Sequence, residues 1–200
     1  MAFPERIAIA SRNAHKLREI DRICAEWPVA WLTVENHDAP WPDVEETGST
    51  YLDNALLKAR AGAAALDEAA LADDSGIEVD ALGGRPGPRS ARFASEDATD
   101  RQNLDELIRA IKGVPGSGRT ARYRCVAALA FPDDRVLHAE GVCEGTLLAK
   151  PRGTGGFGYD PIFVPEGWDR TMAELTDEEK DLISHRGRAF RALGEMLASG

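Results

Sequence analysis

The fold class is indicated most clearly by the segment Arg6-Ile7-Ala8-Ile9-Ala10-Ser11-Arg12-Asn13-Ala14-His15-Lys16. Its first five residues form the short apolar run of a buried strand, and the polar residues at 11–13 end that run. Apolar residues then recur at helical spacing from Leu17 to Trp27, and Pro28 stops the pattern. A strand that leads through a short polar loop into a helix is typical of α/β proteins.

Helices and strands alternate along the rest of the chain. The expected helices begin at Ser or Thr residues that can act as N-caps: Thr50, Thr99, Thr176 and Ser184. The expected strands are 29–34, two short pieces interrupted at Asp73–Gly76, and a long hairpin formed by 123–131 and 136–148. This mixture predicts a single α/β domain over residues 1–200 with a mixed sheet.

Composition and charge narrow the class of protein. A chain of 200 residues, of which 43% are hydrophobic and 29% charged, has the balance of a soluble globular domain. Its formal charge of −10 disfavours binding to nucleic acid, because such binding depends on a basic surface. No apolar run approaches the ~18 residues of a membrane span, and the N-terminus has no signal-peptide pattern. We therefore expect a cytoplasmic protein with a small-molecule ligand and no nucleic-acid or membrane partner.

Several common catalytic and nucleotide-binding motifs are absent from the sequence. It has no GxxxxGK[ST] phosphate loop, no GxSxG nucleophile elbow and no HExxH zinc motif. Residues 153–158 match the dinucleotide pattern GxGxxG, but Pro161 and Pro165 follow where that pattern needs a helix to begin. The glycines of this segment indicate either a backbone that comes close to a ligand or a plain flexible loop.

The loop after the first expected strand is a candidate anion site. Ser11 and Asn13 offer a hydroxyl and an amide there, and Lys16 lies one turn into the following helix. A helix N-terminus with a nearby ammonium group favours phosphate. An ordinary N-cap with a solvated lysine is the alternative, because the pattern is common.

Two acidic pairs are candidates for holding Mg²⁺. Asp73 and Asp74 follow an apolar run, and Glu45 and Glu46 lie in a loop before a helix. Mg²⁺ prefers one or two carboxylates together with water and substrate phosphates. Adjacent side chains of an extended segment point to opposite faces, so at most one of the two aspartates is expected to face a given site. The alternatives are an Asx-turn at 73–76 and a solvated acidic loop.

The C-terminal part of the chain supplies further polar candidates. Lys180 and His185 lie at neighbouring helix caps, so both side chains can face one site, although a surface lysine and a buried histidine are the simpler interpretation. Phe157 and Tyr159 add aromatic rings to the glycine-rich segment. Anion donors, paired carboxylates and this aromatic segment together indicate a Mg-dependent nucleotide site.

The motifs, taken in order, resemble the inosine triphosphate pyrophosphatase family, whose bacterial members are called Ham1-like or RdgB-like. The similar segments are Ser11–Lys16, Glu45–Gly48, Asn54–Ala59, Ala72–Ile77, Gly83–Arg92, Gly153–Phe163 and Ala173–Gly187. The resemblance implies Mg-dependent hydrolysis of ITP, dITP, XTP and dXTP to the monophosphate and pyrophosphate, which removes deaminated purines from the nucleotide pool. It also implies a mixed, elongated, twisted sheet with helices forming two lobes around a nucleotide cleft, in a homodimer.

The same resemblance implies roles for individual residues. Asp74 would be the catalytic carboxylate and, with Glu46, a ligand of Mg²⁺. The phosphates would be held by Ser11, Arg12, Asn13, Ala14, His15, Lys16 and Lys180. The nucleoside would be bound by Ser75, Phe157, Gly158, Tyr159, Asp160, His185 and Arg186. The family often has a small residue where this chain has Arg12, whose side chain could contact phosphate or point to solvent.

Two other functions remain as alternatives. A Maf-like nucleotide pyrophosphatase would prefer pyrimidine or modified nucleotides, but the segments Gly153–Phe163 and Ser184-His185-Arg186 match the purine family. A nucleotide-binding regulator without catalysis would be expected to lose some of the charged residues of the site. All of these are present: Lys16, Glu46, Asp74 and Lys180.

Overall fold

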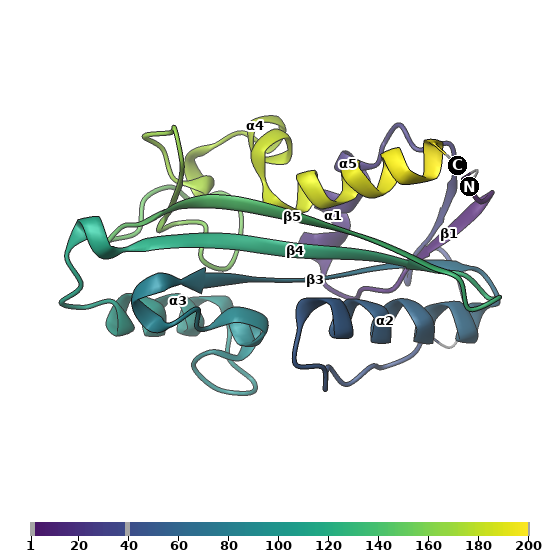
Figure 1. Cartoon of the computed structure of the whole chain (residues 1–200), viewed down its shortest axis with the longest axis horizontal. Helices are drawn as coiled ribbons and strands as arrows, with labels where there is room; N and C mark the ends of the chain where they lie inside the picture. Colours follow the sequence, from purple (N-terminus) through teal and green to yellow (C-terminus); the bar gives the residue numbers. More distant parts are fainter. Residues whose placement is uncertain (1–2, 39–40, 200) are drawn as a thin grey trace. The chain divides into compact units, whose positions relative to one another are not determined.

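The computed structural model describes residues 3–38 and 41–199, which form a six-stranded sheet and its helices (Figure 1). The strands are β1 (Arg6–Ile9), β2 (Ala30–Leu32), β3 (Ala69–Val79), β4 (Thr120–Ala130), β5 (Val136–Leu147) and β6 (Phe163–Pro165). The helices are α1 (Ala14–Ile23), α2 (Tyr51–Leu66), α3 (Asp100–Ala110), α4 (Asp177–Ile183) and α5 (His185–Ala198). Among the described residues, none of these helices is both long and apolar enough to cross a membrane.

The sheet is mixed, as the sequence predicts. Its strands follow the order β2-β1-β3-β4-β5-β6. Strand β1 runs parallel to both β2 and β3, whereas β6 runs antiparallel to β5.

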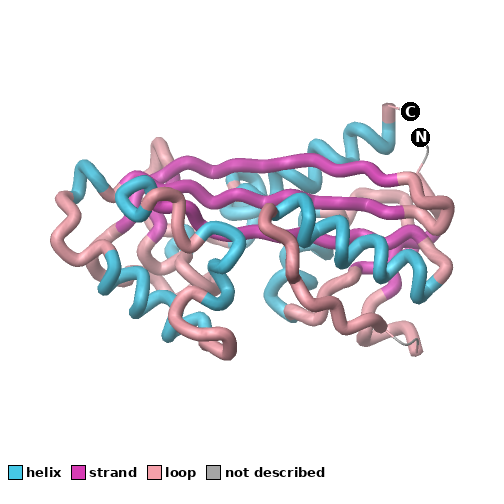
Figure 2. Tube along the Cα trace, turned by 60° about the horizontal axis from the view of Figure 1, so that its bottom comes forward, coloured by secondary structure: helices cyan, strands magenta, loops and turns pink. Residues whose placement is uncertain are grey.

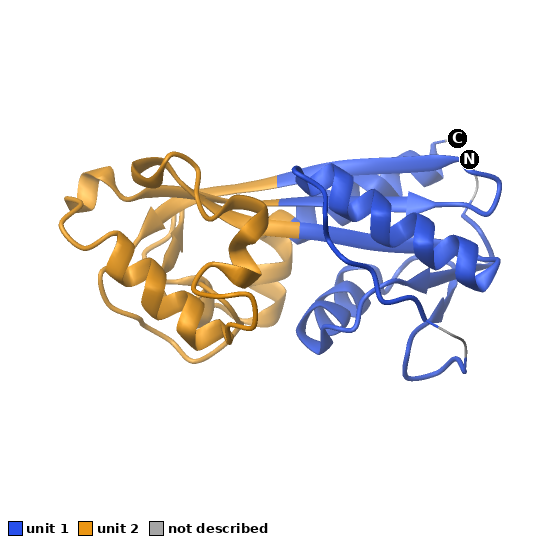
Figure 3. Ribbon diagram, turned by 90° about the horizontal axis from the view of Figure 1, so that it is seen from below, with its two compact units in different colours: residues 1–74, 125–141, 186–200 blue, residues 75–124, 142–185 orange. Residues whose placement is uncertain are grey.

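The chain divides into two compact units (Figure 3). Unit 1 holds the described residues up to Asp74, 125–141 and those from Arg186 onward, and unit 2 holds 75–124 and 142–185. That the chain acts as one domain stays a prediction.

Unit 1 buries both faces of its part of β3. On one face, Leu71 of β3 packs in a cluster with Ile20 of α1 and Phe190 of α5. On the other face, the neighbouring Ala72 packs in a cluster with Ala59 of α2. Figure 1 shows the same arrangement, with α2 and α5 on opposite sides of β3. Because side chains alternate along a strand, consecutive residues of β3 meet different helices.

Unit 2 has its own apolar interior. Val79 of β3, Leu107 of α3 and Tyr123 of β4 share one buried cluster. Several long loops join the helices and strands (pink in Figure 2). The glycine-rich segment before β6 contains neither helix nor strand, yet its residues Tyr159 and Ile162 are buried in the same cluster. The segment is therefore anchored to unit 2 by its own side chains.

The predicted interruption of the strand at Asp73–Gly76 is wrong. Strand β3 runs from Ala69 to Val79 without a break, and both carboxylates lie inside it, 3% and 4% exposed. The strand can hold them because each carboxylate meets cationic or amide partners within unit 1. The first helix is also shorter than predicted, since it ends at Ile23 with Cys24 as its C-cap.

The predicted capping boxes and hairpin are confirmed, whereas the strand predicted over 29–34 is limited to Ala30–Leu32. The helices α2, α3 and α4 each begin at a complete capping box: Thr50 with Asp53, Thr99 with Gln102, and Thr176 with Glu179. The hairpin between β4 and β5 is closed by the N–H of Phe131, which donates to the carbonyl of Arg135 at 2.9 Å. These elements depend on neighbours in the sequence, which is why their pattern can be recognised there.

Candidate active site

The loop after β1 forms an ordered helix start. The side-chain oxygen of Asn13 accepts hydrogen bonds from the N–H groups of His15 at 2.9 Å and of Lys16 at 3.2 Å. The N–H of Asn13 in turn donates to Ser11 Oγ at 3.2 Å. Asn13 is therefore the N-cap of α1, and Ala14 is the first residue of the helix. This cap leaves the loop preorganised, with backbone N–H groups at a helix N-terminus, as anion binding requires.

Lys16 is not a solvated surface lysine. Its side chain is 17% exposed, and its Nζ lies 3.1 Å from Oδ2 of the buried Asp73. The same Oδ2 accepts hydrogen bonds from Nε and Nη2 of Arg186 at 3.3 and 3.1 Å, and Nη1 of Arg186 donates to Glu19. Burial alone would raise the pKa of Asp73, but these cations outweigh burial and hold that pKa well below its usual range. Asp73 therefore remains ionised and fixes two cations in place.

Asp74 points to the opposite side of β3, toward α2. Its Oδ2 accepts a hydrogen bond from Nδ2 of Asn54 at 3.1 Å, and its Oδ1 lies 3.7 Å from Nζ of Lys58. Burial raises the pKa of Asp74; Lys58 and Lys16 counter only part of this effect, and the Glu46 carboxylate adds to it. A buried carboxylate whose pKa is raised is well suited to accept a proton. The prediction that the two aspartates face different surroundings is thus confirmed.

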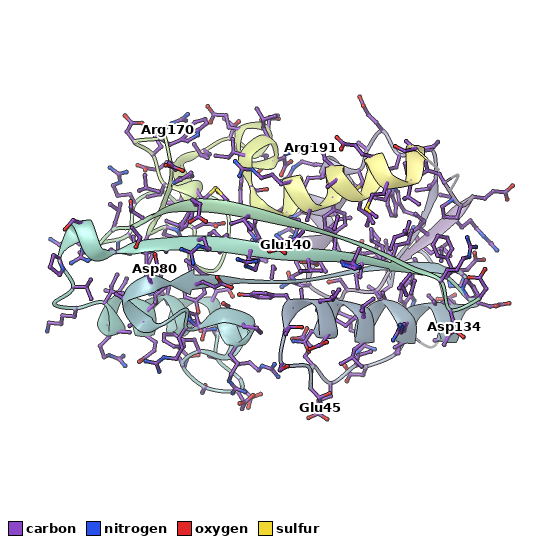
Figure 4. All side chains as sticks on the ribbon, viewed as in Figure 1. Glu45, Asp80, Asp134, Glu140, Arg170 and Arg191 are labelled. Carbon is purple, nitrogen blue, oxygen red and sulfur yellow. The ribbon has the colours of Figure 1, made fainter. Side chains whose placement is uncertain are left out.

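Glu46 lies close to this second carboxylate. Nζ of Lys58 donates to Glu46 Oε1 at 2.6 Å, so one ammonium group contacts both Glu46 and Asp74. The loop is held beside α2 because the N–H of Gly48 donates to Oδ1 of Asn54 at 2.8 Å. Glu45, by contrast, is exposed at the outer end of its loop (Figure 4).

The donor set around Lys58 fits a divalent cation. Two carboxylates, from Glu46 and Asp74, already share one positive charge there. Two carboxylates are also what Mg²⁺ ordinarily takes from a protein, the remaining ligands being water and substrate oxygens. Within the part of the chain that the structure describes, no group of three or more His, Cys, Asp or Glu side chains could hold a metal ion.

Unit 2 contains a second polar cluster, centred on Asp160. Its Oδ2 accepts hydrogen bonds from Nζ of Lys180 at 2.6 Å and from the N–H of Phe157 at 2.9 Å, and its Oδ1 accepts one from the Tyr123 hydroxyl at 3.1 Å. At Gly156, where φ is +67°, an added Cβ would lie 2.1 Å from Asp160 Oδ2. Only glycine fits there, so the segment is shaped around the Asp160 carboxylate.

The remaining residues of unit 2 support an aromatic surface. Nζ of Lys180 lies 5.0 Å from the centre of the half-exposed Phe157 ring. His185 stacks on Tyr123, with ring centres 4.6 Å apart and planes 8° apart. The hydroxyl of Tyr159 donates to the carbonyl of Ser90 at 2.7 Å. Phe157 is thus the half-exposed ring beside a buried, hydrogen-bonded group.

Comparison with known proteins identifies the family. The Ham1 family model matches residues 7–196, nearly the whole chain. The chain belongs to the Ham1 family.

The Ham1 relatives match along almost their full length. A dITP/XTP pyrophosphatase of Streptomyces coelicolor is 51% identical over 94% of this chain and 94% of that protein. A dITP/XTP pyrophosphatase of Geobacillus kaustophilus is 48% identical over 94% of this chain and 92% of that protein. The solved structure of a HAM1 protein from Coxiella burnetii superimposes with a TM-score of 0.87 at 39% identity, covering 98% of this chain and 100% of that one. Both the family and the mixed α/β fold follow from these matches.

The predicted site residues of this Ham1 protein fall into both units. Unit 1 holds Ser11–Lys16, Glu46, Asp74 and Arg186, and unit 2 holds Ser75, Phe157–Asp160, Lys180 and His185. Exposed His15 has its Nδ1 2.9 Å from Nη2 of Arg18. Lys180, predicted to bind phosphate, is buried in unit 2, where its Nζ donates to Asp160 Oδ2 at 2.6 Å; its contact with phosphate stays a prediction.

Sequence reasoning missed three residues of this Ham1 site as functional candidates. Asn54 and Lys58 lie one turn apart on α2 and both reach Asp74, and Glu19 on α1 binds Arg186. The available signal was polar residues on the Ala-rich face of α2, where a purely structural helix would be apolar. Glu19 had no such signal, because a charged residue in a helix normally faces water.

Proposed function

We propose that this chain hydrolyses noncanonical purine nucleoside triphosphates, among them ITP, dITP, XTP and dXTP, to the monophosphate and pyrophosphate. The observation that carries the proposal is Asp74, a buried carboxylate of raised pKa beside Lys58 and the second carboxylate Glu46. Relatives named dITP/XTP pyrophosphatase, about half identical over nearly all of the chain, support the substrate class. Hydrolysis of these nucleotides would remove deaminated purines from the cytoplasmic nucleotide pool. The family resemblance also predicts a homodimer.

We assign Mg²⁺ as the cofactor and Glu46 and Asp74 as its protein ligands. When bound, the metal would neutralise phosphate charge and polarise the α-phosphoryl group. Asp74 would orient the attacking water and accept its proton. Lys16 and the capped N-terminus of α1 would bind the phosphate chain and offset the charge of the leaving pyrophosphate, with Lys180 as a further predicted contact.

Base recognition is assigned to unit 2 and the start of α5. The half-exposed ring of Phe157 would stack on the purine. The guanidinium of Arg186, also predicted to bind the nucleoside, is instead buried against Asp73 and Glu19. His185 or backbone N–H groups would donate to the 6-keto oxygen of hypoxanthine or xanthine. Adenine has an amino donor at that position, so the same groups would be left without an acceptor. A site built on such hydrogen bonds can discriminate by roughly 10⁴-fold.

Pyrophosphate release from ITP, XTP, GTP, ATP and dTTP, each with and without Mg²⁺, tests this function. Mg-dependent release from ITP and XTP is expected, with kcat/KM for ATP lower by roughly 10⁴-fold because its 6-amino group leaves protein donors unsatisfied. A preference for dTTP would indicate the specificity of a Maf-like nucleotide pyrophosphatase. Tight retention of ITP without turnover would make it a nucleotide-binding protein instead.

Replacing Phe157 by alanine tests the stacking role. The KM for ITP is expected to rise by about tenfold, since base–aromatic stacking contributes ~1–3 kcal/mol, while kcat changes less. Phe131→Ala is the matched control, because Phe131 is also half-exposed and also lies against a cation, Arg135, in the β4–β5 hairpin. Equal effects of the two substitutions on KM would remove Phe157 from the nucleoside site.

A further inference from the structure

Arg12 reaches from the loop after β1 to a distant loop of the same unit. Its Nη2 donates to the main-chain carbonyl of Trp41 at 2.9 Å, and its Nη1 lies 3.9 Å from Oδ1 of the exposed Asp43. The guanidinium thereby joins two loops that are 29 residues apart in sequence. The Arg12 side chain is 57% exposed, as the solvent alternative expects, but its guanidinium also contacts protein. The predicted phosphate contact stays a prediction.

Trp41 is itself anchored, so the contact with Arg12 has a fixed end. The indole Nε1 of Trp41 donates to the carbonyl of His37 at 3.0 Å, and the two rings meet edge to face, 6.4 Å apart. The Trp41 side chain also packs against the apolar cluster formed with α2. An arginine bound to the carbonyl of an anchored residue restrains the chain that follows.

The restrained segment is the one that carries Glu46. It is tied at its start through Trp41 to Arg12, and at its end through Gly48 to Asn54. Between these ties, Glu46 contacts the ammonium group of Lys58. Arg12 belongs to the loop that caps α1 and places Lys16. One guanidinium thus links the loop of the anion site to the loop of the second carboxylate.

We infer that Arg12 is a positioning residue. It restrains segment 41–48 against the loop before α1, and this restraint determines the position of Glu46 relative to Lys16 and Asp74. The link to metal affinity rests on the proposed function, whereas the restraint of the segment does not. Loss of the restraint enlarges the set of positions that Glu46 samples, which weakens any ligand that needs both carboxylates at once.

The test compares Arg12→Ala and Arg12→Lys with the control Arg18→Ala, which removes an exposed arginine one turn into α1. Hydrogen exchange is measured on nucleotide-free, metal-free protein. Amides of segment 41–48 are expected to exchange at least about threefold faster in Arg12→Ala, with no change in α5 and none in the control. Arg12→Lys is expected to be intermediate, since an ammonium group makes a less directed contact.

The second readout separates positioning from direct phosphate binding. The Mg²⁺ concentration for half-maximal ITP hydrolysis, and the Kd for Mn²⁺ measured by calorimetry without nucleotide, are expected to rise about three- to tenfold in Arg12→Ala. At saturating Mg²⁺ the KM for ITP should change by less than about twofold.

Two outcomes would overturn the inference. Unchanged exchange in segment 41–48 would show that Arg12 does not restrain it. A large rise in KM for ITP with unchanged Kd for Mn²⁺ would make Arg12 a phosphate ligand. If the wild type fails to hydrolyse ITP, the proposed function is lost, but the exchange experiment still decides whether the restraint exists.

Discussion

Asp74→Asn is expected to lower kcat for ITP hydrolysis by at least ~10²-fold while leaving the protein folded. Asparagine has nearly the same shape and keeps an oxygen for the Nδ2 of Asn54, which donates to Asp74 at 3.1 Å. It lacks the negative charge that Lys58 faces, and it cannot accept a proton from water. Pyrophosphate release at saturating ITP and Mg²⁺ gives kcat, and circular dichroism reports whether the fold is retained.

Asp80→Asn is the matched control for this substitution. Asp80 directly follows β3 and is labelled in Figure 4. Its exposed carboxylate accepts hydrogen bonds from Nη2 of Arg122 at 2.9 Å and from the Thr120 hydroxyl at 2.6 Å. The same chemical change at this position should leave kcat within about twofold of wild type, because it lies outside the proposed site. Near-normal turnover of Asp74→Asn would mean that another group activates the water.

The sequence predicts the elements whose stability is local. The capping boxes at Thr50, Thr99 and Thr176 each bind backbone groups within three residues, so the interaction is visible in the order of the residues. The start of α1 is another such case, since Asn13 caps it through His15 and Lys16. The start of α1, predicted to bind an anion, can therefore be located from its sequence pattern.

The continuity of β3 cannot be predicted in the same way. Two adjacent aspartates and a glycine are typical of a turn, and only partners from far along the chain keep them in a strand. Arg186, which binds Asp73, is 113 residues away, and Asn54, which binds Asp74, is 20 residues away on a helix. Sequence spacing carries no information on such contacts, which is also why it does not predict the role of Glu19. The family resemblance, in contrast, places Asp74 and Glu46 at one metal ion without involving Lys58.

Asp73→Ala is expected to lower the free energy of unfolding by about 3–5 kcal/mol, because removing one partner of a buried ion pair leaves the other charge uncompensated. The Asp73 carboxylate, 3% exposed, faces Lys16 and the fully buried guanidinium of Arg186. The Glu19 carboxylate, which also binds Arg186, can compensate only part of that charge. Urea unfolding at pH 7, without metal or nucleotide, measures the lost free energy of unfolding. The control is Asp133→Ala, which removes an exposed carboxylate that pairs with Arg135 and is expected to show no comparable change.

A second substitution distinguishes a stranded charge from a simple cavity. The loss of stability in Asp73→Ala can arise because Arg186 is left buried without its main partner. The free energy of unfolding lost in the double variant Asp73→Ala with Arg186→Met should then be clearly smaller than the sum of the two single losses. If the cost came only from lost packing, the double variant would leave the larger cavity and would be less stable than Asp73→Ala alone. A less stable double variant would therefore show that the contact between Asp73 and Arg186, at 3.1 Å, contributes packing more than charge compensation. A double variant at least as stable as Asp73→Ala would show that the role of Asp73 is to compensate the buried charge of Arg186, which would explain why a second buried carboxylate lies next to Asp74.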